Sequence, residues 1–266
     1  MTNRPSSPTR LAILHWKIGA LNEMQYRLNF WVQLFNSAIA LATGLIAIAL
    51  VYGQTNSLAG WSQPELLAVM GVHIIIGGIL KTFIQPNMNR LMDDVQQGTL
   101  DYALTRPADA QLMVSVKEVS LWSAIDIVLG LGVVGWSISE LTSDVRLLDA
   151  IGFLFALVCG ALIIYALWLS VSTISFKVIR TDSMMQLLNG IYEAGRWPVT
   201  VYPALLRASL TFLIPLAFAV TVPAEAISGR INWWMLAVGA LVTIAALAGS
   251  RQIWKWGIRN YAGASA

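Results

Sequence analysis

Long apolar runs, each about long enough to cross a lipid bilayer, constrain this chain more than any other feature. Residues 30–52 contain no charged side chain, and 147–174 contain a single aspartate near their start. A membrane-spanning helix needs about 20 consecutive apolar residues, because an unpaired backbone amide is costly in lipid. Only 12% of the residues are charged, whereas soluble domains carry about 25%. The sequence therefore predicts an all-α protein embedded in a membrane.

The apolar runs predict about six transmembrane helices. Five of them are expected at residues 30–52, 65–85, 113–137, 147–174 and 231–250. The remaining region is broken by Pro198, Pro203, Pro215 and Pro223, and two interpretations of it stay open. Either 183–199 is a short fifth span followed by a re-entrant hairpin at 203–225, or 203–222 is the span and 183–199 lies in the interface. Irregular backbone at membrane depth needs cover from protein or water, so the prolines favour a buried, specialised element.

Basic residues collect on one side of the predicted spans. In the N-terminal segment 1–29, an apolar stripe from Leu11 to Leu28 predicts an amphipathic helix in the membrane interface, with Arg10 and Lys17 off the stripe. This segment also lacks the compact apolar core of a cleavable signal peptide. By the positive-inside rule we expect both termini in the cytoplasm, a membrane domain at 30–252 and a cytoplasmic tail at 253–266.

Candidate groups for catalysis and metal binding are sparse. The two histidines, His15 and His73, lie in different environments, and Cys159 stands alone in an apolar run, so neither a metal site nor a catalytic site is expected. No G-x-x-x-x-G-K-[ST] motif is present, so we expect no ATP hydrolysis by this chain alone.

Two glycine patterns fall inside predicted spans and are interpreted through helix packing. Gly130, Gly132 and Gly135 spell a dinucleotide motif, but a membrane span is the wrong context for it. The series Gly152, Ala156 and Gly160 either forms a small-residue ridge that permits close helix contact or is an accident of composition.

Polar residues within the spans are the candidates for a substrate path. Asp126 is expected near the middle of the third span, and His73 at comparable depth in the second. Glu193 joins them if 183–199 is a span. An ionised group in lipid is costly unless it is paired or faces water, so these residues predict either a polar lining or a structural Asp–His hydrogen bond. Lys81 is expected to extend to the inner interface.

The most informative segment is 86–107, which predicts a helix with one apolar and one polar face. Its apolar stripe comprises Met88, Leu91, Met92 and Val95, and its polar face includes Asp93 and Asp94. Gly98 stands where a helix C-cap is expected, Asp101 starts a further short turn, and Arg106–Pro107 ends it. The pattern predicts a helix that lies along the membrane surface and ends in a sharp turn.

The run Gly98 to Pro107, GTLDYALTRP, resembles the turn after the second span in ABC-2-type permeases, in particular a small subfamily of about 260 residues. The runs RWPVTVYP at 196–203, LIPLAF at 213–218 and VPA at 222–224 are similar to a second signature of that subfamily. The resemblance covers nearly the whole chain. It implies that 86–107 is a coupling helix that docks on a nucleotide-binding subunit through Gly98, Leu100, Asp101, Arg106 and Pro107. It also implies re-entrant outer helices at 203–225.

This resemblance favours an exporter permease that works by alternating access, as a pair of identical or related permease chains in the inner membrane. ATP and Mg²⁺ would bind to a partner ATPase, and no nucleic-acid partner is expected. An acidic residue in the path suits a cationic amphipathic compound, such as a drug, while a lipid or glycolipid is the other option. A membrane-embedded lipid-modifying enzyme and a channel or secondary carrier are the rival functions.

Overall fold

The computed structural model describes residues 27–105, 109–141, 146–174, 176 and 181–261, and within these ranges every regular element is a helix. Five of the described helices are long and apolar enough to cross a membrane, and a sixth crossing is counted if one bent helix pair forms a span. The predicted all-α membrane fold is therefore confirmed. The predicted interfacial helix at 11–28 lies almost wholly outside the described residues, as do Arg106 and Pro107.

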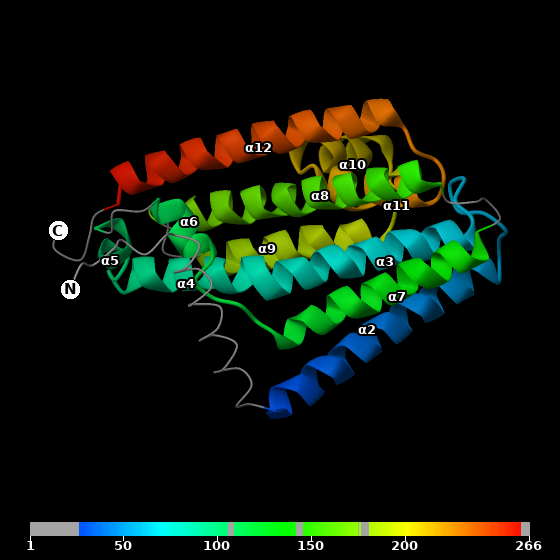
Figure 1. The fold of residues 1–266 in the computed structure, drawn as a ribbon, viewed down its shortest axis with the longest axis horizontal. Helices are drawn as coiled ribbons and strands as arrows, with labels where there is room; N and C mark the ends of the chain where they lie inside the picture. The colour runs from blue at the N-terminus through cyan, green and yellow to red at the C-terminus, as the bar shows by residue number, and fades with distance from the viewer. Residues whose placement is uncertain (1–26, 106–108, 142–145, 175, 177–180, 262–266) are drawn as a thin grey trace.

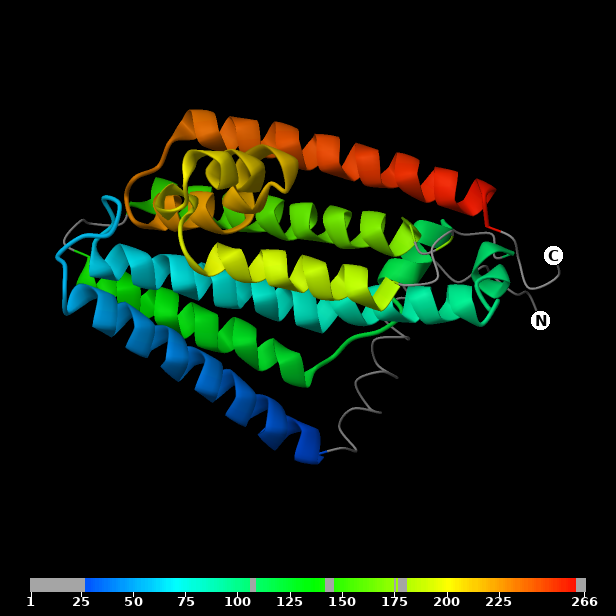
Figure 2. The same ribbon diagram turned by 180° about the vertical axis from the view of Figure 1, so that it is seen from behind.

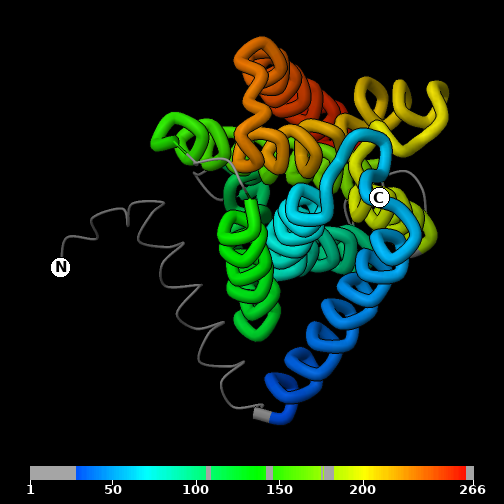
Figure 3. Tube along the Cα trace, turned by 90° about the vertical axis from the view of Figure 1, so that its right-hand side faces the viewer, coloured from blue at the N-terminus to red at the C-terminus, as the bar shows by residue number. Residues whose placement is uncertain are grey.

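The long helices form an elongated bundle (Figure 1). They are α2 (Arg27–Tyr52), α3 (Gln63–Ile79), α7 (Ile125–Glu140), α8 (Leu147–Ile174) and α12 (Trp233–Arg259). The continuous helix Gln63–Gln96, which begins with α3, is the most enclosed of the candidate spans, with 78% of its most apolar stretch buried, against 17% for α2. Seen from the end, α3 lies at the centre and α2 diverges from the bundle toward its first residues (Figure 3). Four of the predicted spans therefore overlap α2, α3, α8 and α12, and those at α2 and α8 agree closely in their bounds.

The second span is longer than its predicted range. Helix α3 passes through a π-helical turn, η1 (Leu80–Ile84), directly into α4 (Gln85–Gln96), and the three form one helix of 34 residues. At 1.5 Å per residue this helix is about 50 Å long, whereas the hydrocarbon core of a bilayer is about 30 Å thick. The prediction that this segment lies along the membrane surface is wrong, because α4 continues the axis of α3 (Figure 1).

The third span begins later than predicted. Residues 110–115 form the short helix α6 (Ala110–Ser115), and an extended segment then leads to the turn η2 (Trp122–Ala124), which opens α7. The candidate span is therefore Trp122–Glu140. Asp126, expected near the middle of the span, lies in the first turn of α7. The last span also differs, since α12 continues to Arg259 and takes in part of the predicted tail at 253–266.

The region between α8 and α12 is divided into short elements. They are α9 (Thr181–Glu193), η3 (Ala194–Arg196), η4 (Val199–Val201), α10 (Ala204–Ala208), η5 (Ser209–Leu213), η6 (Ala217–Thr221) and α11 (Val222–Ile227). Helix α9 runs along the bundle beside α3 and α8 (Figure 2). The helices 204–213 and 217–227 meet at 79°, and Pro215 lies in the break between them. Pro198, Pro203 and Pro223 likewise stand at element starts, where a missing N–H is tolerated.

The segment 200–230 begins and ends at the same end of the bundle. At its start, Thr200 Oγ1 accepts a hydrogen bond from Trp61 Nε1 at 2.9 Å. At its end, the Arg230 guanidinium lies 5.4 Å from the centroid of the Trp61 ring and its Nε is 2.6 Å from Glu65 Oε1. Both ends therefore hold one loop, the one that joins α2 to α3. A segment that returns to its point of entry has the shape of a re-entrant hairpin, as in the first interpretation. Helix α9, the fifth span of that interpretation, is not among the five candidate spans of the described residues, so both interpretations stay open.

Small residues set the closest helix contacts. A Cβ atom at Gly130 would lie 2.8 Å from the carbonyl oxygen of Gly71, so α7 packs directly on α3. A Cβ atom at Gly160 would lie 2.7 Å from Ala219 Cα, which brings α8 against the hairpin. The ridge interpretation of 152–160 is thus supported, whereas the packing role predicted for Gly132 and Gly135 is wrong, because a Cβ atom at either would meet nothing within 4 Å. Cys159, on the same helix as the ridge, is a buried free thiol.

Candidate functional site

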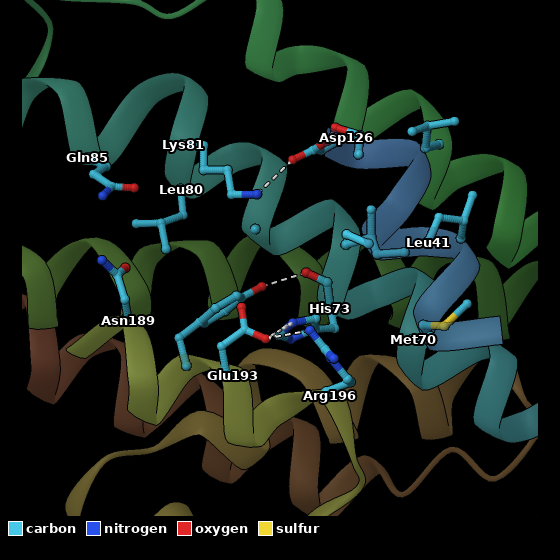
Figure 4. Close-up of a pocket in the computed structure, with 17 residues that line it drawn as sticks. Leu41, Met70, His73, Leu80, Lys81, Gln85, Asp126, Asn189, Glu193 and Arg196 are labelled. Atoms are coloured by element: carbon cyan, nitrogen blue, oxygen red, sulfur yellow. Dashed lines mark hydrogen bonds and ion pairs between the residues drawn. The ribbon is translucent and has the colours of Figure 1, made fainter. Parts of the chain in front are cut away.

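A cavity of about 280 Å³ lies between α2, α3, α7 and α9. It brings together all three residues that the sequence predicted for a substrate path, His73, Asp126 and Glu193. Figure 4 shows their side chains directed into a common space, from α3, α7 and α9 respectively. The helix that closes one side, α2, is the one that diverges from the bundle, so the cavity lies beside the loosest packing among the long helices.

Asp126 is almost completely buried and accepts contacts from two other helices. Its Oδ2 lies 3.0 Å from Lys81 Nζ, and its Oδ1 accepts a hydrogen bond from the hydroxyl of Ser37. The Asp126 side chain is 7% exposed and that of Lys81 is 53% exposed. Lys81, which was expected to extend to the inner interface, pairs with this carboxylate while its side chain stays half exposed. The alternative of an Asp–His hydrogen bond is wrong, since the partners of Asp126 are Lys81 and Ser37.

The opposite wall of the cavity carries a second ion pair. Arg196 Nη2 lies 2.7 Å from Glu193 Oε2, one turn apart at the end of α9. His73 Nε2 approaches the same carboxylate oxygen at 4.0 Å, and its ring stacks on Tyr192 with centroids 4.5 Å apart. The Tyr192 hydroxyl donates to the backbone carbonyl of His73. His73 Nδ1 is buried without a hydrogen-bond partner. The histidine is therefore fixed by stacking and by a backbone contact rather than by a strong side-chain hydrogen bond.

The π-helical turn explains how Lys81 reaches the cavity. A π-turn widens the helix by one residue and releases a backbone carbonyl from the regular ladder, and such turns are frequent at functional sites. Here the carbonyl of Thr82 accepts a hydrogen bond from Ser120 N at 3.0 Å, in the segment that leads into α7. A Cβ atom at Gly78 would lie 2.7 Å from Ile127 N, so α7 begins in contact with α3. The two helices are thus joined just where Asp126 and Lys81 pair.

A polar network fixes the helix that extends beyond the cavity. Asp94, predicted on the outward polar face of α4, is instead buried and receives Lys117 Nζ at 2.9 Å and Arg90 Nε at 3.1 Å. Asn87 Oδ1 accepts the backbone N–H groups of Lys117 and Glu118, each at 2.8 Å. These contacts bind the segment 116–121 to α4. The same segment leads to Asp126, so these contacts connect α4 to the start of α7.

The predicted coupling turn has an exposed and a buried part. Gly98 has φ +70°, so it ends the helix in the left-handed region, as its C-cap position predicted. Leu100 is fully buried and its side chain packs into the core, so it anchors the turn within this chain, and its part in docking stays a prediction. Asp101 opens α5 (Asp101–Leu104) and is partly exposed, while Tyr102 is 76% exposed. The exposed surface of the turn is therefore carried by α5.

A second contact ties this end of the bundle to α12. Arg251 donates to Gln111 Oε1 at 2.7 Å and pairs with both carboxylate oxygens of Asp109, which also caps α6 by accepting Leu112 N at 3.2 Å. The Arg251 guanidinium holds the pKa of the Asp109 carboxyl below its usual value. These contacts hold the start of α6 against α12.

Among the described residues, no group of three His, Cys, Asp or Glu side chains is placed to hold a metal ion. Residues 38–265 match a protein family described as ABC-2 family transporter protein. The match covers far more than half of the chain. The protein belongs to the ABC-2 transporter family. The predicted family is thereby confirmed. No curated protein and no solved structure gives a significant match to the chain.

Membership of this family places the cavity and the projecting end of α4 in a membrane transporter. Typical members are permeases rather than catalytic subunits, and an ATPase partner is implied. The sequence located His73, Asp126 and Glu193 by their polarity in apolar surroundings, but missed the partners Lys81 and Arg196. An opposite charge at similar depth on a neighbouring helix was the available signal for Lys81. No sequence signal identified Ser37 or Asn87, which are common residue types in positions that only the tertiary contacts define.

Proposed function

We propose that this ABC-2 family member is the permease subunit of an ATP-driven exporter, which moves an amphipathic substrate out of the cytoplasm by alternating access. A separate nucleotide-binding subunit supplies ATP hydrolysis, and its ATP and Mg²⁺ are not bound by this chain. The permease works as a pair of chains, identical or related. Transport requires two states that the energy source binds differently, because only differential binding shifts such an equilibrium. The observation that carries the proposal is the continuous helix from the cavity to the exposed turn at α5.

The structure supplies a route by which that turn acts on the cavity. A force applied at α5 is transmitted through Leu100 and the Asp94 network to α4 and to the segment 116–121. That segment is hydrogen-bonded to the π-turn and enters α7 at Asp126. Displacement of α4 therefore changes the relation between α3 and α7, where Asp126 and Lys81 face each other.

The proposed orientation places α5 and both termini in the cytoplasm, with the loop between α2 and α3 outside. It rests on the distribution of Lys and Arg. The test uses membrane-impermeant maleimide in cells, on a Cys159→Ala background with one new cysteine at a time. We expect Ser57→Cys to react in intact cells and Asp93→Cys to react only after permeabilisation. Both sites are exposed in the structure, so the reverse pattern would refute the orientation.

The coupling surface is tested by charge reversal at α5. In a reconstituted complex with its nucleotide-binding subunit, we expect Asp101→Arg to reduce permease-stimulated ATP hydrolysis and transport together. Glu140→Arg is the matched control, because Glu140 is an exposed acid at the far end of α7. If Asp101→Arg and the control both kept full permease-stimulated ATP hydrolysis and transport, docking at this turn would be excluded.

The substrate preference inferred from sequence depended on an isolated acid. A cationic amphipathic compound was suggested by an acidic residue in the path, and the pairing of Asp126 with Lys81 weakens that reason. We therefore propose an amphipathic substrate without assigning a drug. Resistance and export assays with a deletion strain, run against a panel of amphipathic compounds, test this: accumulation unchanged across the whole panel would refute it.

A further inference from the structure

The charged side chains that line the cavity balance one another. Lys81 pairs with Asp126 at 3.0 Å on one wall, and Arg196 pairs with Glu193 at 2.7 Å on the other. These four are the charged residues among the described lining, apart from His73. Figure 4 shows the two pairs facing each other across the space. With a neutral histidine, the lining therefore carries no net charge but presents both signs on each wall.

The cavity is also divided between polar and apolar ends. The amide side chains of Gln85 and Asn189 lie at one end, beside Leu80, and Leu41 and Met70 lie at the other (Figure 4). The apolar end continues along Ile74 of α3 beside α2, the helix that packs most loosely on the bundle. A molecule with a charged head and an apolar tail matches this division, because each part meets surroundings of its own polarity.

Electrostatics then restrict the head of such a molecule. A head group with a single charge gives the partly desolvated, neutral site one unit of net charge. An unpaired charge away from water is costly in free energy. A head with both charges can place its cation toward Asp126 and Glu193 and its anion toward Lys81 and Arg196. The four protein charges then stay compensated. Lys81, Arg196 and Glu193 are each more than a third exposed, so their side chains are free to reorient toward a ligand.

On the basis of the export function proposed above, we propose that this cavity binds an amphiphile whose head group is zwitterionic. The same head group occurs on membrane lipids and on soluble zwitterions. Because one end of the cavity is apolar, we propose that the ligand also carries an apolar tail. The location of the two ion pairs on opposite walls is the feature that sets the selectivity.

The test is photolabelling of the purified permease in dodecyl maltoside. The probes share one diazirine-bearing dodecyl chain and differ in the head, which is phosphocholine, trimethylammonium or sulfate. Mass spectrometry then measures the label on the lining segments of α2 and α9. We expect the phosphocholine probe to label them about tenfold more than either other probe at equal mole fraction, which corresponds to about 1.4 kcal/mol. Equal labelling by the three probes would overturn the proposal.

Charge-altering variants sharpen the same measurement. Lys81→Met leaves the cavity with a net negative charge, so the preference should move to trimethylammonium. Asp126→Asn leaves a net positive charge and should move it to sulfate. Lys255→Met removes an exposed lysine on α12, outside the cavity, and should change nothing. If Lys81→Met does not yield folded protein, Arg196→Gln removes the other cation and predicts the same shift. An unchanged preference in the folded variants contradicts the proposal, since a merely structural role would not exchange head-group selectivity.

A competition experiment distinguishes a zwitterionic amphiphile from a soluble zwitterion. Phosphocholine without a tail should not displace the zwitterionic probe at the concentration at which dodecylphosphocholine does. Displacement by both alike would refute an amphiphile. The labelling needs neither ATP nor a partner subunit, so its failure is distinct from failure of export. Selective labelling without ATP-driven transport would contradict only the exporter assignment, and transport without head-group selectivity would contradict only the zwitterionic site.

Discussion

The ion pair between Lys81 and Asp126 makes a quantitative prediction about stability. The two side chains come from α3–η1 and α7, and they meet at 3.0 Å with the carboxylate buried and the ammonium half exposed. Lys81→Met removes the cation, so that of the two side chains that contact the buried carboxylate only the Ser37 hydroxyl remains. Asp126→Asn keeps an acceptor for Ser37 and leaves the lysine free to reach solvent. The two single substitutions are therefore expected to differ in cost.

The magnitude follows from the burial of each partner. Two unit charges at 4 Å interact by about 1 kcal/mol in water and by about 4 kcal/mol at an effective dielectric constant of 20. Lys81 is 53% exposed, so the value is discounted toward the lower figure. We expect Lys81→Met to cost about 2 kcal/mol, Asp126→Asn about 1 kcal/mol, and the double variant no more than about 1 kcal/mol. The coupling free energy is then about 2 kcal/mol.

The assay is thermal or chemical unfolding of the purified permease in detergent, for the wild type, both single variants and the double variant. Lys255→Met serves as the control for the loss of a lysine, with an expected change within about 0.5 kcal/mol. The distinctive result is a double variant that is more stable than Lys81→Met. If the two single costs simply add, the side chains do not interact, and the description of the cavity as two compensated ion pairs is wrong.

The remaining predictions concern the packing and the ends of the bundle. Leu100→Ala should lower the free energy of unfolding by about 2–5 kcal/mol, because Leu100 is fully buried. Gly160→Ala should cost about 1–3 kcal/mol through the clash with the hairpin, whereas Gly132→Ala, which meets open space, should be neutral or stabilising. Arg251 lowers the pKa of Asp109, so this stabilisation is present near neutral pH and is lost as the pH falls below about 4. Asp109→Asn should remove that part of the pH dependence.

Each of these has a result that would contradict it. Leu100→Ala with unchanged unfolding would mean that the turn before α5 is not anchored in the core. If alanine at Gly160 and alanine at Gly132 changed the free energy of unfolding equally, the close approach of α8 to the hairpin would be contradicted. An acid-unfolding profile that is identical with and without the Asp109 carboxyl would show that its pairing with Arg251 contributes nothing in solution. Urea or detergent unfolding at several pH values supplies the last comparison.

The parts of the fold that follow from hydrophobic runs were predictable from sequence. The span at 147–174 corresponds to α8, and the prolines marked the segment that is divided into short elements and contains the bent helix pair. Helix ends and directions were not predictable. The apolar residues at 113–121 suggested a continuing span, but Asn87 accepts the backbone N–H groups of residues 117 and 118 and holds the chain extended. That contact joins residues about 30 positions apart, which no local pattern reveals.

The candidate site was predictable in its residues but not in its pairings. His73, Asp126 and Glu193 were found because polar groups in apolar runs need a reason to be there. Their partners depend on how helices rotate against each other. Lys81 was expected to extend to the interface, yet the π-turn and the close approach at Gly78 bring α7 within its reach. The burial of Leu100 was not predictable for the same reason, since an apolar residue in a polar turn packs inward only once the turn folds back on the bundle.

Site-specific photo-crosslinking from α5 tests the central claim most directly. A photoreactive amino acid at position 102, where Tyr102 is 76% exposed, is irradiated in intact cells, with position 57 in the loop between α2 and α3 as the control. Peptide mass spectrometry identifies the adducts. The account predicts a covalent adduct between position 102 and a subunit that contains a P-loop, and none from position 57. A P-loop subunit captured from position 57 but not from position 102 would contradict it.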